Sequence, residues 1–266
     1  MKCAAALIGL LVSGSCAAVV VIPIEIENGN PVAPARINGV DVRLIIDSGG
    51  ERVSLKFAAI NRVSATRTGS HADGTNALGQ TSPQALLSLD SLEIGGRTFR
   101  DVAGQESGTY AEASPGDGAI GRQFLNRFIA VYDYGARRIS LFDSSERDVA
   151  RRDCRGTRVR TLADEEGLVI TGARADQNDM RVLWDTGAVH SVVKKSFAES
   201  RGLPVEAPFY AVRKFEVGGR DVGPLRFVVF DVAAPSRVDG FLGYDFFVDH
   251  VVCIDPRGQV VRVRDK

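Results

Sequence analysis

The sequence lacks an excess of either charge sign, because 33 Lys and Arg residues balance 33 Asp and Glu residues and the formal net charge is zero. A balanced chain has no overall field that would attract nucleic acid or an anionic membrane. No apolar run approaches the ~20 residues that a membrane-spanning helix needs. We therefore expect neither nucleic acid nor a stable membrane span among the partners of this chain.

Residues that usually build metal sites and nucleophilic sites are also scarce, with four Cys and three His in 266 residues. No cysteines have zinc-ligand spacing, and the His71-Ala72-Asp73 stretch is too short for a metal site. The G-x-S-x-G motif of many serine hydrolases does not occur, and the histidines are scattered. The sequence therefore predicts no metal ion and no cofactor, and it does not favour serine hydrolysis.

The first 18 residues are typical of a secretory signal peptide. Lys2 supplies a positive start, residues 4–12 are apolar, and residues 15–18 (Ser-Cys-Ala-Ala) form a small-residue cleavage site. Two alternatives stay open: an uncleaved apolar strand that continues into Val19, and a lipid anchor at Cys16, which the residues just before it fit poorly. The signal interpretation predicts a periplasmic or secreted protein.

Removal of the signal segment leaves two cysteines, Cys154 and Cys253. An even pair is compatible with one disulfide in an oxidising compartment. Two buried free thiols explain the pair equally well, so the sequence leaves the pairing open.

The rest of the chain repeats itself. Three kinds of segment recur in the same order: an apolar run ending in Asp, a small hydroxyl residue and Gly; an apolar-Gly-Gly-Arg turn; and an Asp-Gly-apolar-apolar-Gly stretch. The pairs are residues 42–50 and 180–188, residues 92–97 and 215–220, and residues 117–121 and 239–243. Three landmarks in one order indicate two homologous lobes, which we place at residues 19–150 and 151–266.

Within each predicted lobe, short β-branched runs alternate with Gly-containing turns, as is typical of all-β sandwiches and barrels. Asn38-Gly39 between apolar residues predicts a type I′ hairpin. Helices are expected to be few and short, at residues 55–62, at residues 194–201, and after Gly121 and Gly243. The sequence thus predicts an all-β protein of two β-barrel lobes with a few short helices.

Between the lobes, at residues 143–160, the apolar pattern lapses and arginines cluster among acidic residues. A nucleic-acid-binding patch would need interleaved aromatic residues for base stacking, and few candidates for that role occur there. We interpret the segment as a solvated linker.

Both copies of the first repeat place an Asp at the end of a strongly apolar run, where an unpaired ionisable side chain is costly to bury. An Asp before Ser-Gly or Thr-Gly can simply close a turn by accepting backbone amides. That role explains Asp47 or Asp185 alone, but not their recurrence at the same point of both copies. Lobes related by a pseudo-two-fold axis bring equivalent positions together. Two carboxyl groups there would share one proton, because like charges at short range resist double ionisation.

With their downstream partners, these motifs resemble those of the aspartic peptidases, and most of all the bacterial retropepsin-like and pepsin-like aspartyl proteases. The Asp-Ser-Gly stretch at residues 47–49 is followed by Ala119-Ile120-Gly121, and the Asp-Thr-Gly stretch at residues 185–187 by Phe241-Leu242-Gly243. The resemblance covers nearly all of the mature chain. It implies a bilobal acid-protease-like fold with a cleft between the lobes, and aspartic-type endopeptidase activity on a polypeptide substrate.

The resemblance also implies roles for individual residues. Asp47 and Asp185 would be catalytic, holding the attacking water, with one as general base and the other, protonated, donating to the peptide carbonyl. Because one chain supplies both aspartates, we expect a monomer.

The loops around the aspartates have implied roles as well. Ser48 and Thr186 would hydrogen-bond across the lobe interface, and Gly49 and Gly187 would let the backbone approach the carboxylates. The first lobe carries an insertion that includes the Gly-, Asn- and Asp-rich residues 68–80. This insertion would be the flap that closes over substrate. The flap residues that we single out are Gly69, His71, Gly74 and Asn76.

Some positions depart from the family pattern. Gly50 stands where Ala or Ser is usual, Glu51 is charged, and the proposed flap has no Tyr, for which His71 or Asn76 would have to substitute. The alternative function is therefore a catalytically weak or inactive secreted peptide-binding protein on the same bilobal fold.

Residues 116–121 also satisfy the G-x-G-x-x-G nucleotide-binding fingerprint. That motif needs a preceding strand and a following helix in a βαβ unit, and residues 110–115 make a poor strand. The internal repeat explains these glycines better, so we do not favour nucleotide binding.

Overall fold

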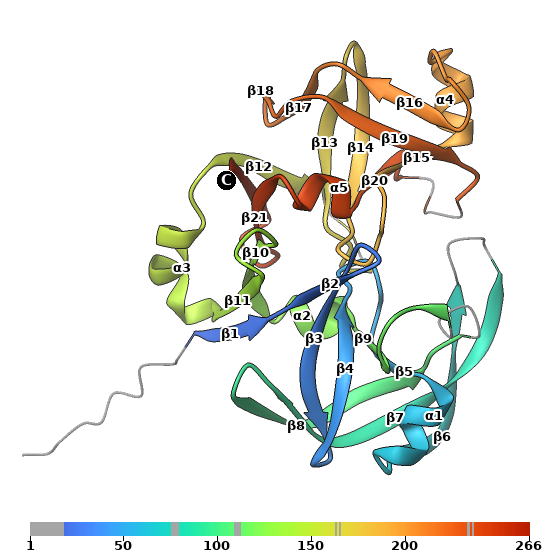
Figure 1. Ribbon diagram of the computed structural model, residues 1–266, viewed down its shortest axis with the longest axis vertical. Helices are drawn as coiled ribbons and strands as arrows, with labels where there is room; N and C mark the ends of the chain where they lie inside the picture. Colours follow the sequence, from blue (N-terminus) through green and yellow to red (C-terminus); the bar gives the residue numbers. More distant parts are fainter. Residues whose placement is uncertain are drawn as a thin grey trace, which may run out of the picture.

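The computed structural model describes residues 19–75, 80–108, 113–162, 164, 166–232, 235 and 237–266. The signal segment expected at residues 1–18, with Cys16, lies outside these residues and stays a prediction. The described chain consists mostly of strands and short helices, gathered into two lobes that lie one above the other in Figure 1. The predicted all-β, bilobal architecture is confirmed. None of the helices in this part of the chain is long and apolar enough to cross a membrane.

The N-terminal lobe is built on an eight-stranded sheet, which lies at the bottom of Figure 1. Its strands in spatial order are β2 (Glu25–Glu27), β3 (Asn30–Ile37), β4 (Val40–Ile46), β9 (Gly118–Ile120), β5 (Val53–Leu55), β8 (Arg97–Glu106), β7 (Thr81–Ile94) and β6 (Thr66–Thr75). In β4, Val42, Leu44 and Ile46 are buried in the core and alternate with exposed or partly covered residues near the start of the strand. This alternation is the period-two pattern that the sequence shows.

The C-terminal lobe has the corresponding strands in a sheet at the top of Figure 1. They are β13 (Ile170–Ala175), β14 (Asn178–Trp184), β20 (Gly240–Leu242), β15 (Val192–Lys194), β19 (Leu225–Phe230) and β16 (Phe209–Val212), with β17 (Phe215–Val217) and β18 (Arg220–Asp221) attached to β13. Trp184 ends β14 and is fully buried, as expected for a core residue.

A third group of strands joins the two lobes. In spatial order it contains β1 (Val20–Pro23), β11 (Arg138–Asp143), β10 (Phe128–Asp133), β21 (His250–Asp255), β22 (Val260–Asp265) and β12 (Thr157–Leu162). Strand β10, which belongs to the first repeat, pairs with strand β21 of the second repeat, and Val131 lies opposite Cys253. Strands of both lobes therefore share one hydrogen-bonded sheet, which holds the lobes together.

The two lobes use the same strand pairings at their centres, which confirms the internal repeat. In the first lobe β4 pairs in parallel with β9, and in the second lobe β14 pairs in parallel with β20. The Asp that opens each Asp-Gly-apolar-apolar-Gly stretch binds the same backbone position of the facing strand. Asp117 accepts from the Arg43 amide at 2.9 Å, and Asp239 accepts from the Arg181 amide at 2.8 Å.

Four of the short helices in the described chain lie close to their expected places, whereas the helix at Arg147–Asp153 was not expected. The helices are α1 (Phe57–Arg62), α2 (Arg122–Leu125), α3 (Arg147–Asp153), α4 (Lys195–Arg201) and α5 (Tyr244–Phe247), with a 3₁₀ turn at Ser144–Glu146. The Asn38-Gly39 turn between β3 and β4 has positive φ at both residues, 50° and 82°, as a type I′ hairpin requires.

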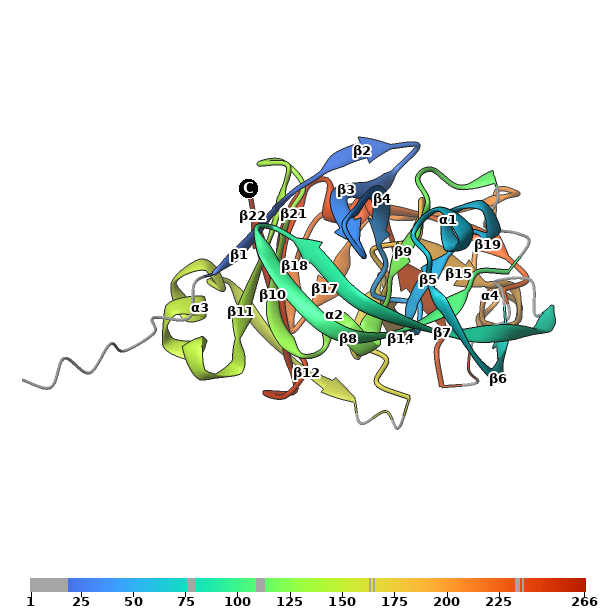
Figure 2. The ribbon, with the colours of Figure 1, turned by 90° about the horizontal axis from the view of Figure 1, so that it is seen from below.

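The β6–β7 hairpin carries the residues expected to form a flap. In Figure 1 it runs along one edge of the N-terminal lobe toward the C-terminal lobe, and Figure 2 places it at the end of the molecule opposite α3 and β11. A bulge interrupts its ladder between Arg67 and His71, where Gly69 has a φ of 80°. The insertion expected to form the flap is therefore a β-hairpin in its described part. Asn76 lies outside the described residues.

The interpretation of residues 143–160 as a solvated linker is wrong. This stretch forms the 3₁₀ turn, α3 and most of β12, and α3 spans the expected lobe boundary at residue 150. Although its arginines are largely exposed, Ala150 and Cys154 are buried against the joining sheet. Cys154 forms a disulfide with Cys253 of β21, with Cα atoms 5.3 Å apart. Only one turn of α3 faces the sheet. The segment therefore contains too few apolar residues for its packing to be predicted from the sequence.

We predict that the disulfide stabilises the joining sheet. It closes a loop with a sequence separation of 99 residues. Its removal should increase the entropy of the unfolded chain, so the double substitution Cys154→Ser/Cys253→Ser should lower the free energy of unfolding by about 2–4 kcal/mol. Urea unfolding measures the change, with the reduced wild-type protein as the matched control. Equal stability of the oxidised wild type and the double variant would contradict the prediction.

Candidate active site

Asp47 sits at the end of β4 in a loop that is held by backbone hydrogen bonds. Its amide donates to the carbonyl of Ile120 in β9 at 3.0 Å. Its Oδ1 atom accepts the amides of Gly49 at 3.0 Å and Gly50 at 2.8 Å. The turn-closing role expected of a lone Asp is therefore real, but it uses only one of the two carboxylate oxygens.

Asp185 occupies the equivalent place after β14. Its amide donates to the carbonyl of Leu242 in β20 at 3.1 Å, and its Oδ1 atom accepts the amide of Gly187 at 2.9 Å. The parallel strand pairs β4–β9 and β14–β20 thus place both aspartates at matching strand ends.

Ser48 and Thr186 link the two loops by a set of crossed hydrogen bonds. The Ser48 amide donates to Thr186 Oγ1 at 2.9 Å, and the Thr186 amide donates to Ser48 Oγ at 3.0 Å. The hydroxyl of Ser48 donates to the carbonyl of Trp184 at 2.8 Å, and that of Thr186 donates to the carbonyl of Ile46 at 2.7 Å. Both side chains are buried. Such fully satisfied buried networks fix geometry, because any displacement leaves a polar group unpaired.

The glycines show how closely the two aspartates approach each other. A Cβ atom on Gly49 would lie 2.5 Å from the carboxyl carbon of Asp185, and one on Gly187 would lie 2.5 Å from that of Asp47. Each carboxyl group therefore lies directly over the backbone of the other lobe's loop. Both aspartates are half-buried and keep access to solvent.

The two carboxyl groups form a hydrogen-bonded pair with unequal proton affinities. Burial, and then the negative charge of Asp47, raise the pKa of Asp185 to about 8. Burial also raises the pKa of Asp47, but the amides of Gly50 and Gly49 and the positive charge of Arg122 oppose the rise. Because like charges this close resist double ionisation, we expect the pair to share one proton, with a carboxylic acid and a carboxylate side by side.

The departures at positions 50 and 51 leave this geometry in place. The Gly50 amide binds Asp47, and a Cβ atom there would lie only 2.7 Å from Asp47 Oδ2, so a glycine fits this loop without displacing the carboxylate. Glu51 forms an ion pair with Arg52 at 2.6 Å and accepts from Gln123 at 3.0 Å. Its charge is thus compensated locally.

Two residues near the aspartates were not predicted from the sequence. The buried Arg122 begins α2 and donates to the Gly49 carbonyl at 2.9 Å. The buried hydroxyl of Tyr134 donates to the Thr186 carbonyl at 3.4 Å, and burial raises its pKa, so the ring stays neutral. Comparison of the repeats could have found Arg122, because Tyr244 occupies its place in the second copy.

Three of the expected flap residues, Gly69, His71 and Gly74, lie in the described part of the β6–β7 hairpin. Gly69 and His71 are exposed, and Gly74 packs against the buried Gln84 of the neighbouring strand. Among the residues that the structure describes, no hydrogen bond or ion pair joins Gly69, His71 or Gly74 to Asp47 or Asp185. Their role as a flap stays a prediction.

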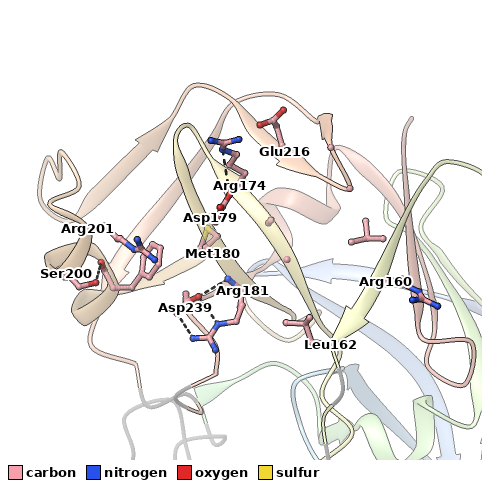
Figure 3. Close-up of a pocket in the computed structure, with 16 residues that line it drawn as sticks. Arg160, Leu162, Arg174, Asp179, Met180, Arg181, Ser200, Arg201, Glu216 and Asp239 are labelled. Atoms are coloured by element: carbon pink, nitrogen blue, oxygen red, sulfur yellow. Dashed lines mark hydrogen bonds and ion pairs between the residues drawn. The ribbon is translucent and has the colours of Figure 1, made fainter.

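A groove of about 1120 Å³ lies elsewhere in the C-terminal lobe, over β13, β14 and α4 (Figure 3). Its charged groups largely neutralise one another: Arg181 binds Asp239 at 3.1 Å, and Arg174 lies 3.7 Å from Asp179. Neither aspartate of the pair lines it. We therefore place the chemistry at the aspartate pair.

No set of three or more His, Cys, Asp or Glu residues in the described part of the chain is arranged to bind a metal ion. The paired carboxyl groups are instead suited to exchange a proton between themselves and a water molecule.

Comparisons with known proteins agree with this geometry. The sequence model described as aspartyl protease matches residues 33–124, a stretch that contains Asp47 but not Asp185. The structure is similar to the crystal structure of aspartic proteinase from Irpex lacteus, with a TM-score of 0.62 and 11% sequence identity over 94% of this chain and 98% of that chain. None of the curated proteins compared with this chain matches it. The two matches support an aspartic protease family and the bilobal pepsin-like fold, while the narrower bacterial retropepsin-like assignment stays a prediction.

We predict that a methyl group at Gly187 disrupts the pair. In Gly187→Ala the new Cβ would push the Asp47 carboxyl group aside, and misplacement by about 1 Å should cost roughly 100-fold or more in kcat. Gly172→Ala is the matched control, because a Cβ at this exposed glycine of the same lobe meets no atom within 4 Å. Peptide cleavage by the folded variants measures the effect. Equal kcat for the two variants would contradict the close approach described above.

Proposed function

We propose that this chain is an aspartic-type endopeptidase that hydrolyses peptide bonds in polypeptides with a water molecule held between Asp47 and Asp185. The observation that carries the proposal is the reciprocal packing of each carboxyl group over the other lobe's glycine, which brings the two groups close enough to share one proton. The match to the aspartyl protease family over residues 33–124 supports it.

The proposed reaction uses the unequal protonation of the pair. The ionised carboxylate removes a proton from the water as its oxygen attacks the carbonyl carbon of the peptide, and the protonated carboxyl donates to the carbonyl oxygen. Both groups must be in place at the same time, since a doubly protonated pair lacks the base and a doubly ionised pair lacks the acid. The crossed hydrogen bonds of Ser48 and Thr186 would hold the two loops during the reaction.

The proposed substrate site lies where the β6–β7 hairpin approaches the C-terminal lobe in Figure 1. There the hairpin would close over a bound peptide and limit the access of water. Both aspartates come from one chain, which favours a monomer. The Cys154–Cys253 disulfide suits an oxidising compartment and favours the periplasm or the exterior of the cell.

The alternative, a catalytically weak peptide-binding protein on the same fold, was motivated by Gly50 and Glu51. The Gly50 amide that binds Asp47 and the local pairing of Glu51 with Arg52 both favour the catalytic proposal instead.

We predict that each aspartate is required for turnover. Asp47→Asn or Asp185→Asn should abolish cleavage of denatured casein, because either change leaves the pair without a carboxylate base or without its shared acidic proton. The matched controls are Asp41→Asn and Asp179→Asn, whose exposed side chains lie on the strands that lead to the two sites. A pepstatin-like inhibitor should block the wild type. Unchanged turnover in either active-site variant would refute the proposed function.

We also predict the upper pH limit of activity. Because burial and the charge of Asp47 raise the pKa of Asp185 to about 8, the pair should keep its proton through neutral pH. As the pH rises through this pKa the acid is lost, so kcat/KM for a peptide substrate should fall. Initial rates between about pH 3 and about pH 9 locate this descending limb. A descending limb in the range of an ordinary exposed aspartate would contradict the raised pKa.

A further inference from the structure

Arg122 connects the loop of one aspartate to the opposite lobe. It is 8% exposed, and its Nη1 atom donates to the Gly49 carbonyl while Nε donates to the Glu166 carbonyl, both at 2.9 Å. Its backbone amide also donates to the Gly50 carbonyl at 2.8 Å. The carbonyl groups of Gly49 and Glu166 thus hold the guanidinium in place beside the loop of Asp47.

The guanidinium of Arg122 is bound by backbone carbonyl groups of both lobes. Among the described residues no ion pair involves Arg122, and the side chain of Glu166, whose carbonyl it binds, pairs with Arg237 instead. A buried cation without a counter-charge is costly, even when carbonyl groups satisfy its hydrogen bonds. The Gly50 and Gly49 amides favour the ionised form of Asp47 most, and the positive charge of Arg122 adds a smaller effect in the same direction.

The second lobe has no such charge at the equivalent position. Tyr244 follows Gly243 as Arg122 follows Gly121, and its ring stacks on that of Tyr134 with centroids 6.1 Å apart. Tyr132 and Tyr134 also interact electrostatically with the pair, but burial raises the pKa of both, so they are neutral. Arg122 is therefore a charge that distinguishes two otherwise similar halves of the site.

We propose that Arg122 is the positioning residue that makes the aspartates unequal, so that Asp47 is the carboxylate base and Asp185 is the proton-donating acid. This assignment rests on the proposed function. In the first step Asp47 would take a proton from water as the water oxygen bonds to the peptide carbonyl carbon, while Asp185 would give its proton to the carbonyl oxygen. The products of this step are a neutral tetrahedral diol, a protonated Asp47 and an ionised Asp185, so protons and charge balance.

The test compares complete pH profiles of kcat/KM for Arg122→Met and Arg122→Lys. Loss of the charge in Arg122→Met should raise the pKa of the ascending limb, which reports ionisation of Asp47, by roughly half a pH unit or more. Arg122→Lys keeps the charge, so its ascending limb should stay at the wild-type position even if its rate falls. A purely structural role would lower the rate in both variants without moving the limb.

Asn126→Ala is the matched control for the link between the lobes. Asn126 lies at the end of the same helix and donates to the Gly167 carbonyl at 2.7 Å, so it links the same two segments without a charge. Its removal should leave the ascending limb in place. A limb that moves equally in Asn126→Ala and Arg122→Met would overturn the proposal.

The reciprocal variant keeps the proposal testable if Arg122→Met does not fold. Tyr244→Arg would place a positive charge beside Asp185, and it should move the descending limb to lower pH. Descending limbs at the same pH in the wild type and a folded Tyr244→Arg would count against the proposal. An inactive wild type would refute the proposed function itself, whereas an active Arg122→Met with unshifted limbs would refute only the role of Arg122.

Discussion

The structure depends on holding two carboxyl groups against each other, although like charges at short range repel. One proton shared between the two groups would relieve the repulsion, and the glycine backbones under both carboxyl groups permit the close approach. The crossed bonds of Ser48 and Thr186 prevent the loops from separating, because separation would break all four of these buried hydrogen bonds. The sheet shared by the lobes and the Cys154–Cys253 disulfide maintain the same approach at longer range.

Duplication supplies this site with two matching halves, and catalysis needs them to differ. The strand pairings and the Asp117 and Asp239 contacts are nearly identical in the two lobes. One shared proton makes one carboxyl group the acid and the other the base even in equivalent surroundings, and an asymmetry of the site then decides which group keeps the proton. Arg122 against Tyr244 is such a difference, located one residue beyond the repeated glycine in each copy.

Much of the site could be predicted because the repeat itself carries the information. Recurrence of an Asp after an apolar run marked Asp47 and Asp185, and the Asn38-Gly39 turn followed from local chemistry. Residues 143–160 were misread because α3 presents a single turn to the sheet, and Arg122 was missed because its importance comes from burial beside Asp47. The segment expected to form the flap is a hairpin in its described part, and its role over a substrate stays a prediction.

The sequence by itself determined which residues are repeated, and therefore that two lobes exist and that each offers one aspartate at a strand end. It also determined the turns and helices that depend on neighbouring residues alone. Only the tertiary structure decided that the two carboxyl groups meet, that Cys154 reaches Cys253, and that Arg122 lies against the Gly49 carbonyl. These contacts join residues far apart in the chain, and proton affinity depends on burial and on charges in space, which no local pattern of residues encodes.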